Sequence, residues 1–295
     1  MASLREVKDR IGSVNSTRKI TSAMKMIASS KLHKAQAAIT NFLPYSEKLN
    51  SILSNLLSAD SGYESPFAQQ REIKKIAVIV FSSNSSLCGA FNANIIKEAN
   101  AVYAEYKKQI GTENIEFYPV GKKITDAFKK KEIKIEGNYQ EMLENPAYRP
   151  VADLAYALIH KFMNKEIDKI ILIYHHFKST ASQIITRKTL LPFEPESLNE
   201  EAVKSNNSYQ SDYILEPSHN EILESLIPKV LVSGLYAALL DSVASEHAAR
   251  TIAMQTATDN ADDLLQELNI QYNKTRQQSI TNELLDIIAG AAALE

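Results

Sequence analysis

A polar loop between an expected strand and an expected helix is the first place in this sequence where chemistry could occur. The loop runs from Ser83 to Ser86, after the β-branched run of residues 74–82 and before a helix over residues 92–109. In many α/β proteins this position binds phosphate, because glycine N–H groups cradle the oxygens and a lysine opens the helix. Here the only glycine is Gly89, and the next lysine is Lys97. The P-loop and the dinucleotide-binding motif are both absent, so the residues disfavour nucleotide binding.

Three further candidates for chemistry are weaker. Cys88 lies near a helix N-terminus, which would lower the pKa of its thiol, but a small apolar residue that closes a loop is the favoured interpretation. His175 and His176 are adjacent on an expected strand, so their side chains point to opposite faces and cannot share a metal. His247 follows Glu246 without the second histidine, four residues away, of a zinc-binding helix. We therefore expect no metal, no cofactor, and a binding or mechanical role rather than catalysis.

The middle of the chain alternates strands with helices. Apolar, β-branched runs predict strands over residues 74–82, 115–120, 169–177 and 183–191, and helices are expected over residues 92–109, 122–131 and 151–164. This alternation is typical of an α/β unit with a mainly parallel sheet. The fourth strand follows the third after a short turn, so we expect that pair to be antiparallel.

The last stretch of the chain, from Ser218 to Glu295, predicts one very long helix. Ser218 and Glu221 have the spacing of a capping box. Behind them a stripe of apolar and small residues repeats near the seven-residue spacing of a coiled-coil seam. Its members are Ala237, Leu240, Ala244, His247, Thr251, Met254, Thr258, Ala261, Leu265, Leu268 and Tyr272. A seam needs a partner helix.

The other end of the chain supplies that partner, a helix over residues 2–58. Its stripe begins at Leu4, Val7, Ile11 and Val14 and is expected to continue through Ile20, Met24, Ile27, Ala35, Ala38 and Phe42. Pro44 lies inside the pattern and should kink the helix or break it briefly. One core helix of a globular bundle is the alternative interpretation, and the narrowness of the stripe disfavours it.

The predicted fold class is α/β plus long helices. The two ends of the chain form an antiparallel two-helix coiled coil, and a mainly parallel, Rossmann-like α/β domain is inserted between them. The expected boundaries are an N-terminal helix over residues 1–58, a linker over 59–71, the α/β domain over 72–195, a loop and foot segment over 196–217 and a C-terminal helix over 218–295.

Composition narrows the class of protein. The chain has 295 residues and a net charge of -2, which gives no global attraction to nucleic acid or to an anionic membrane. The single cysteine, Cys88, excludes an internal disulfide and fits a reducing compartment. We find no run of about 18 apolar residues and no signal peptide, so we expect a cytoplasmic protein without direct membrane insertion.

The two ends of the chain resemble the gamma subunit of F-type ATP synthases. The resemblance is carried by SLREVKDRIGSVNSTRKITSAMKMIASSKLHKAQ at the N-terminus and by SEHAARTIAMQTATDNADDLLQELNIQYNKTRQQSITNELLDIIAGAAA at the C-terminus. LCGAFN at Leu87 to Asn92 and DYILEP at Asp212 to Pro217 match in place and order. One departure is the loop before LCG, where Asn84, Ser85 and Ser86 replace the Asp-Arg-Gly-like sequence common in the family.

The resemblance implies a central rotor that does no chemistry itself. In that family the coiled coil stands inside a ring of alpha and beta subunits, and the α/β domain forms a foot with the epsilon subunit on the membrane c-ring. Proton flow turns the rotor, which drives the beta catalytic sites through their states. The implied location is the cytoplasmic face of the bacterial inner membrane, as part of a peripheral complex.

The family motifs also imply contacts for particular residues. Met24 and Lys25 would face the moving lever of beta, although a plain seam position is an equal alternative for Met24. Arg276, Gln277, Thr281 and Glu283 would contact beta loops higher in the cavity. Asp212, Tyr213 and Glu216 would lie at the foot, near epsilon and the membrane ring. Two other classes remain as alternatives: a nucleotide-utilising α/β enzyme with helical extensions, and a free-standing coiled-coil adaptor.

The extreme C-terminus has a different pattern from the seam. From Ile280 onward, apolar residues that include Leu284, Leu285 and Ile288 cover more than one side of the helix. Such a helix must be buried, yet one antiparallel partner covers only a single stripe. We therefore expect a hydrophobic bearing tip that a sleeve of alpha and beta subunits covers.

Overall fold

The computed structural model describes residues 3–59, 65–193 and 215–292. The chain divides into two compact units: unit 1 holds Met1–Ser29 and Arg250–Glu295, and unit 2 holds Ser30–Ala249. The two long helices, α1 (Leu4–Ala59) and α7 (His219–Ala292), each contribute residues to both units. The predicted long helices at the two ends of the chain are therefore present.

Unit 2 contains a four-stranded sheet with the order β2-β1-β3-β4. Its strands are β1 (Ile76–Phe81), β2 (Ile115–Val120), β3 (Lys169–Ser179) and β4 (Ser182–Leu191). The central strand β1 pairs in parallel with both β2 and β3, with Ile76 opposite Ile115 and Lys169. β4 pairs antiparallel with β3. The sheet is thus mainly parallel with one antiparallel edge, which confirms the prediction for the last two strands.

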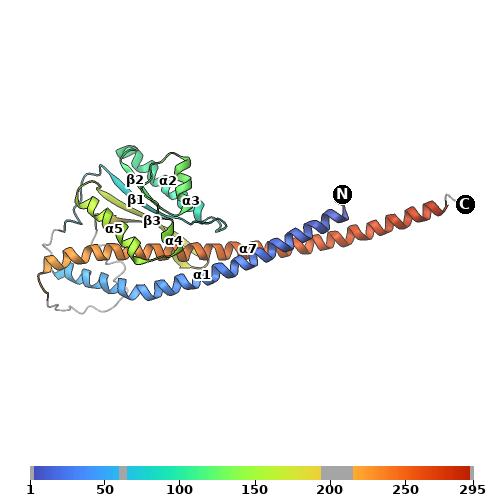
Figure 1. Ribbon diagram of the computed structural model, residues 1–295, viewed down its shortest axis with the longest axis horizontal. Helices are drawn as coiled ribbons and strands as arrows, with labels where there is room; N and C mark the ends of the chain where they lie inside the picture. The colour runs from blue at the N-terminus through green and yellow to red at the C-terminus, as the bar shows by residue number, and fades with distance from the viewer. Residues whose placement is uncertain (1–2, 60–64, 194–214, 293–295) are drawn as a thin grey trace. The chain divides into compact units, whose positions relative to one another are not determined.

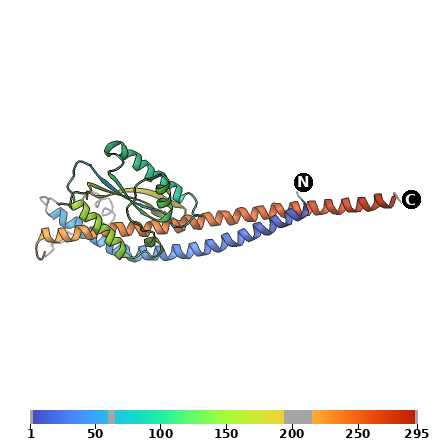
Figure 2. The same ribbon diagram turned by 45° about the horizontal axis from the view of Figure 1, so that its top comes forward.

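Helices cover both faces of this sheet (Figure 1). On one face lie α2 (Phe91–Ile110) and α3 (Lys122–Lys130), and on the other lie α5 (Tyr148–Met163) and part of α7. The rotated view in Figure 2 shows the same layers. Side chains alternate along β1, so Ile76, Val78 and Val80 pack toward α2 and α3, and Ala77, Ile79 and Phe81 pack toward α5 and α7. A four-residue helix, α4 (Glu141–Glu144), was not expected from the sequence.

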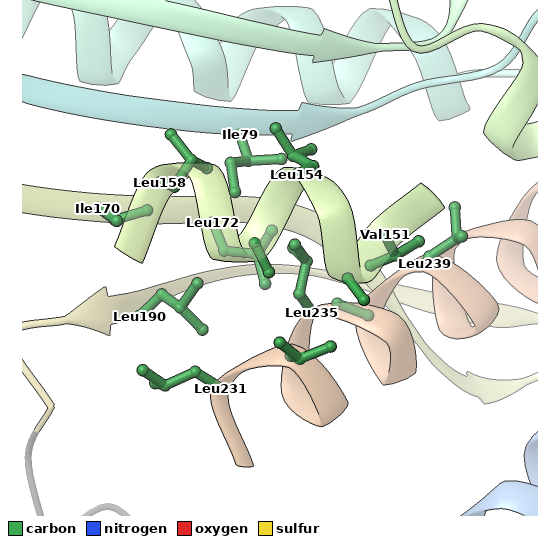
Figure 3. Packing of buried hydrophobic residues seen from close by; sticks show 14 of the residues in the cluster. Ile79, Val151, Leu154, Leu158, Ile170, Leu172, Leu190, Leu231, Leu235 and Leu239 are labelled. Carbon is green, nitrogen blue, oxygen red and sulfur yellow. The ribbon is translucent and has the colours of Figure 1, made fainter. Parts of the chain in front are cut away.

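The core on the α5 side joins the inserted α/β domain to α7. Figure 3 shows Leu154 and Leu158 of α5 on either side of the sheet residue Ile79, and the packing continues to Leu235 and Leu239 of α7 in the same cluster. All five are buried. Fully burying a leucine contributes on the order of 1.5–3 kcal/mol, so this shared core fixes α7 firmly to the sheet within unit 2.

A buried carboxylate braces the edge strand β2. The Glu116 carboxylate forms ion pairs with Lys75 Nζ at 2.7 Å and with Lys161 Nζ at 3.0 Å. The Tyr118 hydroxyl donates to the same carboxylate at 2.8 Å. Burial opposes its ionisation, but these donors outweigh the burial and lower the pKa of Glu116 to about 2. Burial also raises the pKa of Tyr118 to about 12. The network joins β2 to α5 and to the residue that directly precedes β1.

Both long helices begin with a serine cap followed three residues later by a glutamate. At α7, Glu221 N donates to Ser218 Oγ at 3.4 Å, which confirms the predicted serine cap, and the Glu221 carboxylate accepts from the Ser218 hydroxyl at 3.0 Å rather than from its backbone N–H. At α1, Ser3 and Glu6 form the complete capping box, with Ser3 N donating to Glu6 Oε2 at 2.8 Å and Glu6 N to Ser3 Oγ at 3.3 Å. The same four-residue signature in the sequence could have revealed the second box.

The helix α1 continues without a break through Pro44. The short break is therefore absent, although proline removes one backbone hydrogen bond. Both Pro44 and Thr40, whose carbonyl loses its donor, are exposed, so the freed carbonyl lies on a solvent-facing side of the helix. Exposure is the condition under which such a loss is tolerated.

The helix α7 is long and apolar enough to cross a membrane, judged by length and composition alone. Half of the apolar window in question is buried inside the protein, as in the core helix of a folded domain. The expectation that no stretch would be apolar enough is thus corrected. It required consecutive apolar residues, whereas a window of this kind tolerates interspersed Ser and Gly.

Candidate functional site

The candidate site is the pair of helices in unit 1, residues 4–29 of α1 and 250–292 of α7, which we call the shaft. Arg18 Nη1 lies 2.8 Å from Asp262 Oδ1, and the hydroxyls of Thr21 and Thr258 are 2.8 Å apart. Residue numbers rise along one helix as they fall along the other. The shaft helices are therefore antiparallel, as predicted.

The seam of the shaft follows the predicted heptads on α7. Met254, Ala261 and Leu268 are buried and seven residues apart. The alternate seam positions, Thr251, Thr258, Leu265 and Tyr272, are half-buried. This is the alternation expected of a coiled-coil seam. The sequence pattern is confirmed for this part of α7.

The seam on α1 differs from the expected one. The stripe that contains Ile20 and Ile27 was expected to face the partner helix, but these side chains are 60% and 59% exposed. Thr21 and Ala28 are buried in their place. The heptads that begin at Leu4 and Val7 continue through polar residues, and the isoleucines occupy the outer flank. Sequence reasoning assigned the apolar residues to the seam because it weighed polarity above strict seven-residue spacing.

The outer flank of α1 is therefore apolar. Ile20, Met24 and Ile27 recur at four- and three-residue steps, which places them on one side of the helix. Met26 beside them is 67% exposed, whereas Met24 and Lys25 are half-buried. The sequence predicted partner contacts at Met24 and Lys25, assigned Ile20 and Ile27 to the seam, and gave no role to Met26. The signal in the sequence was that these isoleucines do not fall on the seven-residue spacing that begins at Leu4 and Val7.

Beyond the start of α1, the helix α7 continues alone. Because the helices are antiparallel and Arg18 faces Asp262, the first residue of α1, Leu4, lies opposite about residue 276. Figures 1 and 2 show α7 extending past the N-terminal end of α1. The tip residues are exposed in the chain by itself: Leu284 55%, Leu285 57% and Ile288 63%.

The other residues named from the sequence lie on α7 or before it. Arg276, Gln277, Thr281 and Glu283 are exposed. The Thr281 hydroxyl donates to the Gln277 carbonyl at 2.9 Å, and Ser279 Oγ donates to Glu283 Oε1 at 3.3 Å. These four residues and the tip lie on the same end of one helix. Glu216 is exposed ahead of α7, and Asp212 and Tyr213 lie outside the described residues.

The loop after β1 is filled by its own side chains. Asn92 Oδ1 accepts from Ser83 N at 3.1 Å, and Asn92 Nδ2 donates to Cys88 Sγ at 3.0 Å. Cys88 is buried, which agrees with its interpretation as a small apolar residue that closes the loop. The side chain of Asn92 thus occupies the crook of the loop in which a nucleotide-binding fold holds phosphate.

The helix start beside this loop is occupied as well. In the first turn of α3, Lys122 N donates to Asn84 Oδ1 at 3.0 Å, Lys123 N to the Ser83 carbonyl at 3.0 Å and Ile124 N to Ser82 Oγ at 3.1 Å. Gly121, with φ +117°, allows this close approach, because a Cβ there would lie 2.5 Å from Ser82 Oγ. Donors that could hold an anion are already paired.

The two adjacent histidines have opposite environments, as predicted. His175 is buried and stacks on Phe91 with ring centroids 4.1 Å apart, and burial lowers its pKa to about 4. His176 lies on the other face, where its Nδ1 is 2.6 Å from Asp241 Oδ2 of α7. Within the described ranges, no group of three or more His, Cys, Asp or Glu side chains could hold a metal ion.

Comparison with known proteins identifies the family. The family model described as "ATP synthase" matches residues 3–294. The ATP synthase gamma chain of Phocaeicola vulgatus is 56% identical over 293 residues, which cover 99% of this chain and 100% of that one. The gamma chain of Flavobacterium johnsoniae is 44% identical over 296 residues, with 100% and 99% covered.

Two solved structures share the fold. A chain of the Euglena gracilis mitochondrial ATP synthase rotor in rotational state 1 superposes with a TM-score of 0.61 at 20% identity, covering 94% of this chain and 98% of that one. A chain of the same organism's OSCP/F1/c-ring assembly in rotational state 3 gives a TM-score of 0.64 at 19% identity, with 99% and 94% covered. With the full-length matches above, these likenesses place the chain in the family of ATP synthase gamma chains.

Proposed function

We propose that this chain is the central rotor subunit of an F-type ATP synthase, which couples proton flow through the membrane ring to the conformational cycle of the beta catalytic sites. The observation that carries the proposal is the shaft. Helices from the two ends of the chain pair antiparallel around a seam of small and apolar residues, and α7 continues beyond α1. Two helices joined in this way resist bending and twisting better than one.

We infer that the chain itself carries out no chemistry. The loop after β1 and the first turn of α3 use their hydrogen-bond donors internally, which leaves no cradle for phosphate among these residues. The adjacent histidines face apart. Neither the α/β enzyme nor the free-standing adaptor is favoured once the full-length family match is considered.

The proposed partners follow the surfaces of the shaft. Met24 and the neighbouring Lys25 would face the lever of beta, and the exposed Ile20 and Ile27 extend the apolar flank on which Met24 lies. Higher on α7, Arg276, Gln277, Thr281 and Glu283 would contact beta loops. The tip at Leu284, Leu285 and Ile288 would turn inside a sleeve of alpha and beta subunits.

The proposed foot contacts complete the assembly. Asp212, Tyr213 and Glu216 would lie near the epsilon subunit and the membrane c-ring. The complex would be peripheral, on the cytoplasmic face of the bacterial inner membrane. This placement agrees with the match to gamma chains of bacteria.

Affinity purification of the tagged chain from its own cells tests the proposal. A rotor subunit is expected to bring two larger ATP-hydrolysing subunits with it, and membrane vesicles that lack the chain should lose ATP-driven proton pumping until it is restored. Nucleotide turnover by the chain alone would indicate the enzyme alternative. Recovery of partners without ATP hydrolysis would indicate the adaptor.

A further inference from the structure

Two polar contacts cross the shaft seam at one level. Arg18 pairs with Asp262, and the hydroxyls of Thr21 and Thr258 meet at 2.8 Å. Three residues separate the members on α1 and four separate them on α7, so the two contacts lie within one helical turn. Thr21 is only 9% exposed, which places the hydroxyl pair inside the seam. Arg18 and Asp262 flank it at the partly exposed rim.

The seam on either side of these contacts is built from small or apolar residues. Ala28 and Val7 are the buried residues of α1 on the two sides, and Ala261 lies beside the polar level on α7. Small side chains make shallow knobs, so apolar packing alone distinguishes poorly between nearby axial positions of the two helices. A hydrogen bond between hydroxyls has a narrow range of lengths and is lost after a shift of about 1 Å.

Each threonine also has an acceptor in its own helix. Thr21 Oγ1 lies 3.0 Å from the Arg18 carbonyl, and Thr258 Oγ1 lies 2.8 Å from the Met254 carbonyl. If the bond across the seam opens, neither hydroxyl is left buried without a partner. Opening the contact therefore costs the hydrogen bond across the seam, and both hydroxyls stay paired within their own helices.

We propose that these four residues form a polar key that fixes the axial and rotational register of α1 against α7 in the shaft. In a two-stranded coil, a change of supercoil twist moves one helix along the other, so a contact that resists sliding also resists twisting. A buried polar group at a seam position has this register-setting effect in other coiled coils. The key's use in transmitting torque rests on the proposed function, whereas the key itself is a property of the chain.

The full-length chain can report the register directly. In a Cys88→Ser background, spin labels on cysteines introduced at Ser13 and Glu267, both exposed and about one turn from the key, measure a distance across the shaft. We expect one narrow distance distribution for the intact key. Replacing both threonines (Thr21→Val with Thr258→Val) keeps the β-branched shape and should broaden the distribution by about twofold.

Three variants separate the key from general packing. Thr17→Val removes an exposed hydroxyl that bonds only within α1, to the Ser13 carbonyl, and should change nothing. Thr21→Ser keeps the hydroxyl and should retain the narrow distribution. Asp262→Arg alone should broaden the distribution, and the exchange Arg18→Asp with Asp262→Arg should restore it.

The results decide between clear outcomes. An unchanged distribution in the double valine variant, or equal broadening in Thr21→Ser, would overturn the key. If the spin labels support the key but the wild-type chain fails to restore ATP-driven proton pumping, the proposed function is wrong and the key remains. Circular dichroism of each variant verifies that helix content is preserved before the distances are compared.

Discussion

Glu116 is a buried carboxylate whose charge depends on two lysines and a tyrosine around it. Lys75, directly before β1, and Lys161 of α5 approach it, and Tyr118 donates from the same strand, β2. Removing one partner from a buried ionic group is costly, because the remaining charges lose their compensation. At the residue scale, this network makes the stability of unit 2 depend on pH in a definite direction.

We predict that Glu116→Gln destabilises the chain by about 2 kcal/mol at pH 7, a figure reduced from the buried-pair value because both lysines are about one-third exposed. The pKa of Glu116 in the folded chain, about 2, lies below its ordinary value of 4.5, so the stabilisation is fully present above pH 4.5 and is lost as pH falls toward 2. Urea unfolding of both proteins from pH 7 to pH 3 measures this. A difference between them that stays constant over that range would contradict the prediction.

His175 gives a second pH dependence, in a higher window. Burial lowers its pKa from 6.5 to about 4, so the folded state keeps the ring neutral where the unfolded chain would protonate it. Stability is therefore present above pH 6.5 and falls by about 3 kcal/mol as pH drops toward 4. His175→Phe should abolish this loss because phenylalanine cannot be protonated. The variant retains a ring to stack on Phe91, and Nδ1 has no hydrogen-bond partner that would be lost.

Urea unfolding midpoints at pH 7, 5.5 and 4.5 test the histidine prediction. The exposed His160 supplies the control, since His160→Gln should leave the pH profile of the wild type unchanged. A His175→Phe variant that loses stability between pH 6.5 and 4.5 as steeply as the wild type would show that another group is responsible.

At the scale of elements, the sheet was readable from sequence and the α1 seam was not. β-branched runs bounded by polar turns located all four strands to within two residues. The strand order was not predicted, because it depends on which apolar faces meet in space. Strict heptad counting from Leu4 and Val7 would have reached Arg18, Thr21, Lys25 and Ala28. Three of these side chains are polar, so the seam was not recognised. In the structure Arg18 pairs with Asp262 and Thr21 with Thr258 across it.

The candidate contact surfaces were predictable in part for the same reason. The apolar tip of α7 was recognised because its residues surround the helix, a pattern that one partner cannot cover. The flank of Ile20 and Ile27 was misassigned because three- and four-residue spacing is shared by every helix stripe, whichever way it faces. Burial by a partner helix decides which stripe is the seam, and that information lies in the other element.

The tip of α7 gives the prediction at this scale. No residue of α1 lies opposite residues 280–290, and the apolar side chains there are exposed in the chain alone. We expect amide hydrogen exchange at Leu284 to Ala289 to be fast in the isolated chain and at least about 100-fold slower in the assembled complex, where a sleeve would cover the helix. Residues 235–245 of α7, buried in the shared core, are the internal control and should be protected in both states. Strong protection of the tip in the isolated monomer would contradict the bearing interpretation.

At the scale of the whole molecule, the core of unit 2 and the exterior of the shaft suit different tasks of a rotor. Unit 2 has a large apolar core, which suits a part that must hold its shape. The shaft has a polar exterior with an apolar flank at Ile20 and Ile27 and an apolar tip. Contacts with a stationary partner must break at every step of rotation, so they are best made by apolar side chains without directional bonds. Ion pairs fixed in a desolvated interface would add a barrier.

Met24 is the position at which this reasoning about the whole machine can be tested. Its side chain is half-buried between the seam and the apolar flank, and family resemblance implies an acidic lever of beta beside it. A lysine there would form an ion pair worth about 1 kcal/mol, and each rotational step would have to break it. We predict that Met24→Lys leaves assembly intact but lowers the number of protons pumped per ATP hydrolysed. Ala23→Lys places the same charge one residue away, on a more exposed side of α1, and should pump normally. Proton uptake and phosphate release, measured together in membrane vesicles, give the ratio directly. If the two variants have equal ratios, whether both normal or both reduced, Met24 has no special contact with the lever.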